Sequence, residues 1–234
     1  MRLALIGYGR MGKLIAGLAP GSGHSVVVTV NESHSGLGAA DLAETLQIAD
    51  VAIDFTAAYA VRRNVEACVI AKVPIVVGTT GWNDEKAEIE KIVADRDGSL
   101  VYGSNFSIGV NLYYRVVEHA AELFSKFPEY EVFIEEQHHS RKKDAPSGTA
   151  LELKRRVSRF VDEELEIAST RAGGIPGTHR VGFDGSAEQI LLEHAARSRE
   201  CFAIGAVLAA EWIVGKTGIF EFSEVVDEMI GKRK

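Results

Sequence analysis

The stretch HHSRKKDAPSGTA, residues 138–150, concentrates histidines and basic side chains in one short segment. If the residues before it form a strand, His138 and His139 point to opposite faces, because side chains alternate along a strand. Lys142 follows closely, and two cationic groups in one cleft lower each other's pKa. Such a pair suits proton donation near neutral pH. The stretch therefore predicts a proton-transfer site at His138 and Lys142.

The second half of this stretch is typical of the start of a helix. Asp144 or Ser147 can cap the helix that follows, and Pro146 preorganises its start. Gly148 and Thr149 would then offer backbone N–H groups and a hydroxyl to an anion, most simply a carboxylate. An ordinary capped helix is the preferred interpretation of the aspartate and the proline.

A metal site is the alternative interpretation of the two adjacent histidines. Neighbours on opposite faces of a strand do not easily hold one ion, and Cys68 and Cys201 are distant in sequence. Zinc sites usually combine cysteine and histidine at short, regular spacings. We therefore expect no metal here.

The motif GYGRMG, residues 7–12, has the pattern G-x-G-x-x-G between an apolar run and a helical segment. Gly7 would make the tight turn, Gly9 would let a pyrophosphate approach the backbone, and Gly12 would let helix and strand pack closely. The helix N-terminus would then offer N–H groups to the phosphates. The motif predicts a dinucleotide site, whereas a tight turn without a ligand remains the alternative.

The preference between NADH and NADPH depends on the end of the second apolar run, where Asn31 and Glu32 stand. Glu32 could bond a ribose 2′-hydroxyl, and no arginine or lysine stands beside it to meet a 2′-phosphate. The preference stays open, with NADH favoured on this residue alone.

Two further loops, GTTGW and GSNFS, follow later apolar runs at the expected ligand-binding edge of the sheet. They could simply be polar turns, but together they lie where a nicotinamide ring should bind, so we favour the functional interpretation. The residues that we expect to contact the cofactor are Gly7, Tyr8, Gly9, Arg10, Met11, Gly12, Glu32, Gly78, Thr79, Thr80, Gly103, Ser104, Asn105 and Phe106.

Short apolar runs alternate with helical patterns over the first hundred residues, which predicts a doubly wound parallel α/β sheet. We expect strands at 3–6, 26–30, 51–55, 74–78 and 100–102, and helices at 12–18, 57–71 and 84–96. The pattern then changes to a separate α+β unit with a mixed or antiparallel sheet. There we expect helices at 110–126 and 149–160 and strands at 130–137, 166–171, 178–183 and 186–194.

The last part of the chain predicts an apolar helix at 202–214 and a short acidic helix at 223–230. We expect this C-terminal part to pack against the first domain. The domains predicted are therefore 1–105 with 203–234, for the dinucleotide, and 106–202, for substrate binding and tetramerisation.

The composition is that of an ordinary globular protein, with 46% hydrophobic and 25% charged residues in 234. The net charge of −7 argues against a general nucleic-acid binder. No apolar stretch approaches the roughly 20 residues that cross a bilayer. Two cysteines in apolar surroundings fit a reducing compartment, so we expect a cytoplasmic protein.

Taken together, these motifs resemble the 4-hydroxy-tetrahydrodipicolinate (dihydrodipicolinate) reductase family of the diaminopimelate and lysine pathway. The resemblance rests on E-x-HH-x-x-K-x-DAPSGTA after the N-terminal GYGRMG, and it runs nearly the whole chain. It also includes DVAIDFT, VVGTTGW, SNFSIGVNL, R-x-G near 171–173, GxH at 177–179 and HAARSRECFAIGAVLAAEW.

The resemblance implies reduction of a cyclic, unsaturated dicarboxylate imine by NADH or NADPH in a homotetramer. It implies that His138 is the catalytic acid/base, that His139 contacts substrate and that Lys142 is the proton donor. It further implies that Gly148 and Thr149 hold a substrate carboxylate. The chain departs from some members in lacking a Glu-Arg pair after the second strand, which leaves cofactor preference open.

Two other functions are weighed against this one. A short-chain dehydrogenase would need Tyr-x-x-x-Lys, and no tyrosine here has lysine four residues on. A non-catalytic dinucleotide sensor could keep GYGRMG, but it would have no use for a His-His-Lys cluster beside an anion-binding helix start.

Overall fold

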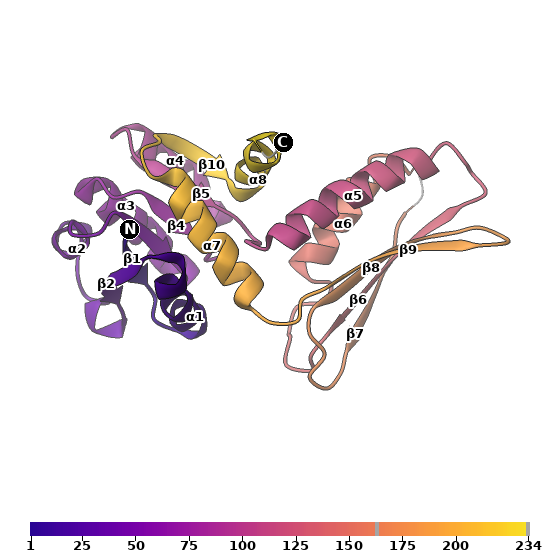
Figure 1. The fold of residues 1–234 in the computed structure, drawn as a ribbon, viewed down its shortest axis with the longest axis horizontal. Coiled ribbons are helices and arrows are strands. Elements are labelled where there is room, and N and C mark those ends of the chain that lie inside the picture. Colours follow the sequence, from indigo (N-terminus) through magenta and orange to yellow (C-terminus); the bar gives the residue numbers. More distant parts are fainter. Residues whose placement is uncertain (162–163, 233–234) are drawn as a thin grey trace. The chain divides into compact units, whose positions relative to one another are not determined.

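Figure 1 shows the computed structural model, which describes residues 1–161 and 164–232. Its contacts divide the chain into two units, one of Met1–Ser107 with Arg199–Lys234 and the other of Ile108–Ser198. The predicted domain boundaries lie between residues 105 and 106 and between 202 and 203. Among the described residues, no helix is long and apolar enough to cross a membrane.

The first unit is built on a six-stranded sheet in the order β10-β5-β4-β3-β1-β2, and all its neighbouring strands pair in parallel. The strands are β1 (Arg2–Ile6), β2 (Ser25–Val30), β3 (Val51–Asp54), β4 (Ile75–Val77), β5 (Ser99–Tyr102) and β10 (Gly218–Glu221). Every residue of β3 and β4 is buried, so both faces of the sheet are covered. This confirms the predicted doubly wound sheet.

Helices cover this sheet in two groups. On one side α1 packs against α7, which contacts the central strands, and on the other α2, α3 and α4 pack side by side. The helices are α1 (Arg10–Leu18), α2 (Ala39–Leu46), α3 (Ala58–Ala71), α4 (Lys86–Ala94), α7 (Glu200–Ile213) and α8 (Phe222–Lys232). Short 3₁₀ turns occur at η1 (Ala19–Ser22), η2 (Glu32–His34) and η3 (Asn83–Glu85).

β10 was not predicted from the sequence; it adds a sixth strand to the sheet by pairing with β5. Only four residues long, it begins at Gly218, and none of its residues is fully buried. A short, half-exposed run lacks both the apolar continuity and the alternation that mark a strand in sequence. Its formation depends on the partner strand.

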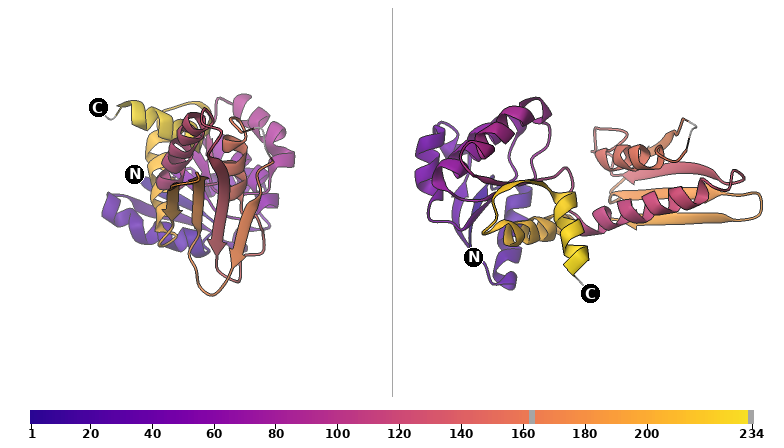
Figure 2. Two further views of the ribbon diagram at one scale, coloured as in Figure 1. Left: turned by 90° about the vertical axis from the view of Figure 1, so that its right-hand side faces the viewer. Right: turned by 90° about the horizontal axis from the view of Figure 1, so that it is seen from above.

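The second unit is a four-stranded sheet in the order β7-β6-β8-β9, with α5 and α6 on one face (Figures 1 and 2). β6 pairs in parallel with β7 and antiparallel with β8, and β8 pairs antiparallel with β9, which makes the sheet mixed as predicted. The elements are α5 (Ile108–Phe124), β6 (Glu131–His138), α6 (Gly148–Val157), β7 (Ile167–Arg171), β8 (Thr178–Asp184) and β9 (Gln189–Ala195).

The core of the second unit lies between its sheet and its helices. Val117 of α5, Leu153 of α6 and Ile134, Val181 and Phe183 of the strands are all buried there. Because every second strand residue faces this core, Glu136 and His138 lie on the same face as Ile134. The sheet therefore carries polar groups on its helix-covered face at the end of β6.

Gly205 marks a close approach between α7 and the loop after β5. A Cβ atom built on Gly205 would lie 1.7 Å from the carbonyl oxygen of Phe106. Overpacking of this kind costs about 1–3 kcal/mol. We therefore expect Gly205→Ala to lower the free energy of unfolding by at least this amount, measured by urea denaturation. Gly17→Ala in α1, where nothing lies within 4 Å, is the matched control; equal stability of both variants would contradict the prediction.

Candidate active site

Glu136 lies at the centre of a polar cluster at the end of β6. Its side chain is fully buried and accepts hydrogen bonds from the backbone N–H of Ser147, the hydroxyl of Ser169 and the guanidinium of Arg171. The distances are 3.1 Å from both oxygens to the Ser147 nitrogen, 2.8 Å to Ser169 and 2.6 Å to Arg171. These donors hold the pKa of Glu136 at about 2, although burial opposes them. The carboxylate is therefore an anchor that stays charged.

His138 stands two residues further along the same face of β6. Its Nε2 lies 3.2 Å from Glu136 Oε2, and its ring meets that of His179 edge to face at 5.1 Å between centroids. Burial lowers the pKa of His138, and the cations of Lys142 and Arg171 lower it further, whereas Glu136 raises it. Burial, rather than a neighbouring cation, is the largest cause of this lowered pKa.

Lys142 lies in the loop between β6 and α6. Its Nζ lies 2.9 and 2.8 Å from the two carboxylate oxygens of Asp144, and its side chain is 23% exposed. Asp144 is therefore an ion-pair partner of Lys142. It does not cap the helix, although it was one of the two caps considered from the sequence. The Lys142 partner lowers the pKa of Asp144.

The helix cap is Ser147, the other candidate from sequence. Its hydroxyl accepts a hydrogen bond from the backbone N–H of Ala150 at 3.2 Å, and α6 begins at Gly148. Pro146 precedes the cap rather than standing in the first helical turn. Gly148 is exposed, with no atom within 4 Å of an added Cβ, so its backbone is open to a ligand.

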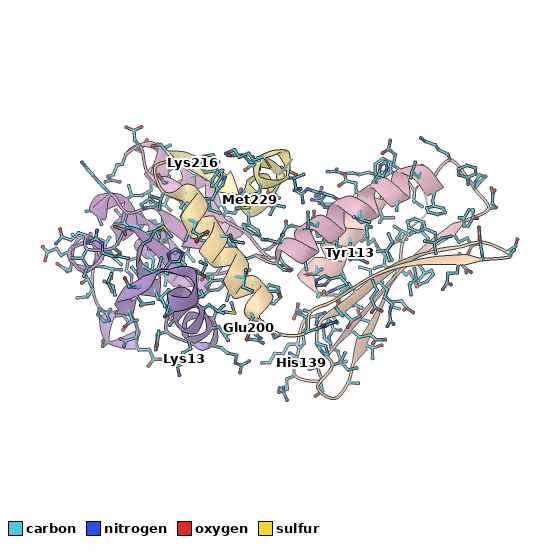
Figure 3. All side chains as sticks on the ribbon, viewed as in Figure 1. Lys13, Tyr113, His139, Glu200, Lys216 and Met229 are labelled. Carbon is cyan, nitrogen blue, oxygen red and sulfur yellow. The ribbon has the colours of Figure 1, made fainter. Side chains whose placement is uncertain are left out.

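Thr149 and His139 complete the residues expected to bind substrate. Thr149 is half-buried and its side chain contacts the hydroxyl of Tyr114 on α5, whose pKa burial raises to about 12. His139 follows the end of β6, where Figure 3 labels it, and is half-buried. Its Nδ1 is buried without a hydrogen-bond partner among the described residues. The backbone places both next to the His138–Lys142 loop.

Sequence reasoning did not assign roles to Glu136, Arg171 or His179. Arg171 Nη2 also donates to the carbonyl of Asp144 at 2.7 Å, so β7 is tied to the Lys142 loop. His179 is 4% exposed, and its Nε2 lies 3.1 Å from Ser147 Oγ. Burial, and next His138, lower the pKa of His179 to about 4. The sequence signals for these residues were the E-x-HH, R-x-G and GxH matches to the resembled family.

Glu136, His138 and His179 also offer ligand atoms that lie within 4.8 Å of one another. Such a set could in principle hold a metal ion. Arg171 already pairs with the single carboxylate, however, and Lys142 lowers the pKa of His138 by its charge. These cations oppose the binding of a further positive charge, so the structure shows an ion-paired cluster around Glu136.

The glycine loop of the first unit has the geometry that its motif predicts. Gly7 has a φ of +92°, and an added Cβ would lie 2.4 Å from the carbonyl oxygen of Phe55. A Cβ on Gly12 would lie 2.2 Å from the Gly7 oxygen, whereas Gly9 is open and no side chain caps α1. The first N–H groups of α1 therefore have no capping side chain.

A cavity of about 780 Å³ opens beside this loop. Its lining includes Tyr8 and Glu32, which were predicted, and Thr56, Tyr59 and Arg63, which were not. The arginine stands 31 positions after Glu32, so sequence reasoning about neighbouring residues could not find it. Arg10 and Met11 do not line this cavity; they belong to the first turn of α1.

A second cavity of about 320 Å³ lies in the same unit and is lined by Thr79, Thr80, Gly103 and Ser104, all predicted, among others. Gly78, Asn105 and Phe106 are outside both cavities. The ring of Phe106 is 2% exposed and packs 4.6 Å from that of Phe222. Any contact of Phe106 with a cofactor must therefore come from its backbone.

Comparison with known proteins assigns both halves of the chain to one family. The family model "Dihydrodipicolinate reductase, N-terminus" matches residues 1–106, and "Dihydrodipicolinate reductase, C-terminus" matches residues 109–226.

Similar curated proteins carry the same activity in their names. The 4-hydroxy-tetrahydrodipicolinate reductase of Christiangramia forsetii is 35% identical, covering 98% of this chain and 99% of its own length. That of Archaeoglobus fulgidus is 36% identical, covering 97% and 100%. Among solved structures, a dipicolinate-bound dihydrodipicolinate reductase from Paenisporosarcina has the same fold, with a TM-score of 0.79 and 21% identity over 96% of this chain and 99% of that one.

Proposed function

The chain belongs to the dihydrodipicolinate reductase family, and from this premise we propose how its residues divide the work. The reaction is the reduction of 4-hydroxy-tetrahydrodipicolinate to tetrahydrodipicolinate, in lysine and diaminopimelate biosynthesis. One hydride and one proton are added, and the hydroxyl group of the substrate leaves as water. A nicotinamide cofactor, when bound, supplies the hydride. The protein must therefore bind a dicarboxylate, place it and provide one proton.

The proton comes from His138 together with Lys142. The observation that supports this most strongly is the Glu136 cluster, in which a half-buried histidine with a lowered pKa adjoins a lysine and an open helix start. Gly148 and Thr149 hold one carboxylate, through the N–H groups of α6 and its dipole. His139 contacts the same substrate. Positive groups of the loop stabilise the negative charge that develops during the reaction.

Pyridine-2,6-dicarboxylate tests this function, because it is a planar mimic of the substrate. We expect it to inhibit turnover competitively with the dicarboxylate and to raise the melting temperature of the protein. Pyridine-2-carboxylate, which lacks one anion, is the control and should act far more weakly. A chain that binds the nucleotide but neither responds to the mimic nor turns over the substrate would be a dinucleotide sensor instead.

For the cofactor we propose a preference for NADH. Glu32 lines the larger cavity with an exposed carboxylate, which can accept hydrogen bonds from ribose hydroxyls and repels a 2′-phosphate. Arg63 lines the same cavity, but it donates to the backbone carbonyls of His34 and Ser35 at 3.3 and 2.8 Å. The Arg63 guanidinium is thus held by backbone carbonyls and is not directed to a 2′-phosphate in this proposal.

Initial rates with both nucleotides measure this preference. We expect kcat/KM to be about tenfold higher with NADH, which corresponds to about 1.4 kcal/mol, because the Glu32 carboxylate repels the 2′-phosphate of NADPH. Glu32→Gln should reduce the difference in kcat/KM between the two nucleotides by raising kcat/KM with NADPH. Equal or better use of NADPH by the unmodified protein would contradict the assignment of Glu32.

We also propose a cytoplasmic homotetramer. Cys68 and Cys201 are free thiols, which fits a reducing compartment. The face of the four-stranded sheet opposite α5 and α6 carries Leu191, which is 47% exposed between two core-facing neighbours on β9. Light scattering would give four times the chain mass of 25.3 kDa if this face joins subunits, and a monomeric mass would exclude it.

A further inference from the structure

Asp54 is a buried carboxylate in the first unit that the proposed chemistry does not use. It ends β3 and is fully buried. Its Oδ1 accepts hydrogen bonds from the backbone N–H of Thr56 at 2.9 Å, the Thr56 hydroxyl at 2.7 Å and the Thr79 hydroxyl at 2.7 Å. Its Oδ2 accepts from Asn64 Nδ2 at 2.7 Å. All these partners are neutral, and burial raises the pKa of Asp54.

Asn64 extends this arrangement along α3. It is fully buried, and while its amide nitrogen donates to Asp54, its amide oxygen accepts from Arg63 Nε at 3.2 Å and Nη2 at 2.9 Å. A donor on one end and an acceptor on the other fix the orientation of the amide. Arg63 in turn holds the end of η2 and the residue after it through the carbonyls of His34 and Ser35.

The two ends of this chain of hydrogen bonds lie in different cavities. Arg63 lines the larger cavity together with Glu32, and Thr79 lines the smaller one. Thr56, whose N–H also donates to Thr79 Oγ1 at 2.7 Å, lines the larger one. The buried pair Asp54–Asn64 therefore connects both parts of the lining.

Fold stability alone does not explain this pair. A buried carboxylate without a cation is costly, and apolar residues of similar volume in such a place are often neutral or stabilising. Asp54 is surrounded by an apolar core, with Val61, Val65 and Cys68 buried on the same helix as Asn64. We therefore infer that Asp54 and Asn64, although costly to bury, fix the positions of the loops to which they are hydrogen-bonded.

We propose that Asp54 and Asn64 are positioning residues of the dinucleotide site, which join the segment after β2 to the loop after β4. This inference rests on the proposed nicotinamide cofactor and goes beyond it. Hydrogen bonds connect Arg63, Asn64, Asp54 and Thr79 in series. The positions of the residues that line one cavity therefore depend on the positions of those that line the other.

Asn64→Leu tests the link, since it keeps the volume and removes both hydrogen bonds. We expect the dissociation constant of NADH and its KM to rise about tenfold, as expected when a buried partner loses its hydrogen bond. The KM for the dicarboxylate should change far less. Energy transfer from protein tryptophan to bound NADH reports binding directly, because Trp82 lines the smaller cavity. Arg62→Met is the matched control, as Arg62 pairs outward with Glu88.

A double-mutant cycle of Arg63→Met and Thr79→Val measures the coupling without touching the buried pair. We expect the two changes to be non-additive in NADH affinity by about threefold or more, and additive in the Asn64→Leu background. The cycle with Asn64 intact still measures the coupling if Asn64→Leu does not fold. Unchanged affinity in Asn64→Leu, or additivity in the cycle, would overturn the inference. Failure of the unmodified protein to bind NADH would instead overturn the proposed cofactor site.

Discussion

His138→Gln will lower kcat about 10²-fold or more, which is the usual contribution of a general acid. Glutamine keeps a polar side chain of similar size at the end of β6, but its amide does not titrate and cannot act as a general acid. Lys142→Ala should have an effect of the same order, because it removes the second member of the proton-donating pair. Steady-state rates with saturating dicarboxylate and nucleotide measure both.

Lys143→Ala is the control for these variants, since Lys143 is an exposed neighbour that lies outside the cluster. The pH profile separates the two roles further. Lys142 lowers the pKa of His138 by its charge, so Lys142→Ala should move the pKa of His138 upward. The alkaline decline of the remaining activity should then occur at higher pH. Turnover close to that of the unmodified protein in either variant would exclude its residue from proton transfer.

Glu136→Gln will destabilise the second unit at neutral pH by about 3 kcal/mol, because a pKa difference of 2.5 corresponds to about that energy. The pKa of Glu136 is about 2 in the folded state, below its ordinary value of 4.5. A lowered carboxyl pKa stabilises the fold above the unfolded pKa, and the contribution is lost as pH falls from about 4.5 to 2. The variant should therefore differ most from the parent at pH 7 and least at pH 2.

Urea unfolding followed by circular dichroism at several pH values measures this difference. Glu131→Gln, at the exposed start of the same strand, is the control and should leave the profile unchanged. A constant offset between Glu136→Gln and the parent across the acid range would show that the carboxylate contributes by packing and not by its charge.

Local patterns were sufficient to predict most of the fold. Alternating apolar runs and helices predict the parallel sheet, and GYGRMG predicts the turn into α1, where Gly7 and Gly12 meet backbone at distances that only glycine allows. The same patterns failed at β10, whose pairing with β5 depends on residues more than a hundred positions away.

The candidate site was only half predictable for the same physical reason. His138 and Lys142 are close in sequence, so their types and spacing suggest their chemistry directly. Arg171 and His179 reach Glu136 through strand pairing, since β7 and β8 flank β6 on either side. Pairing register is a property of the folded sheet, and one sequence gives no direct measure of it.

The return of the chain to its first sheet has a consequence for synthesis on the ribosome. Domains generally fold as units, the N-terminal one first as it emerges. Here β5 would wait as an unpaired edge until Gly218–Glu221 has been made, while the second unit, continuous from Ile108 to Ser198, can fold earlier. An open edge strand is a template for pairing with other chains. The nascent protein is therefore most exposed to aggregation between the emergence of β5 and that of Gly218–Glu221.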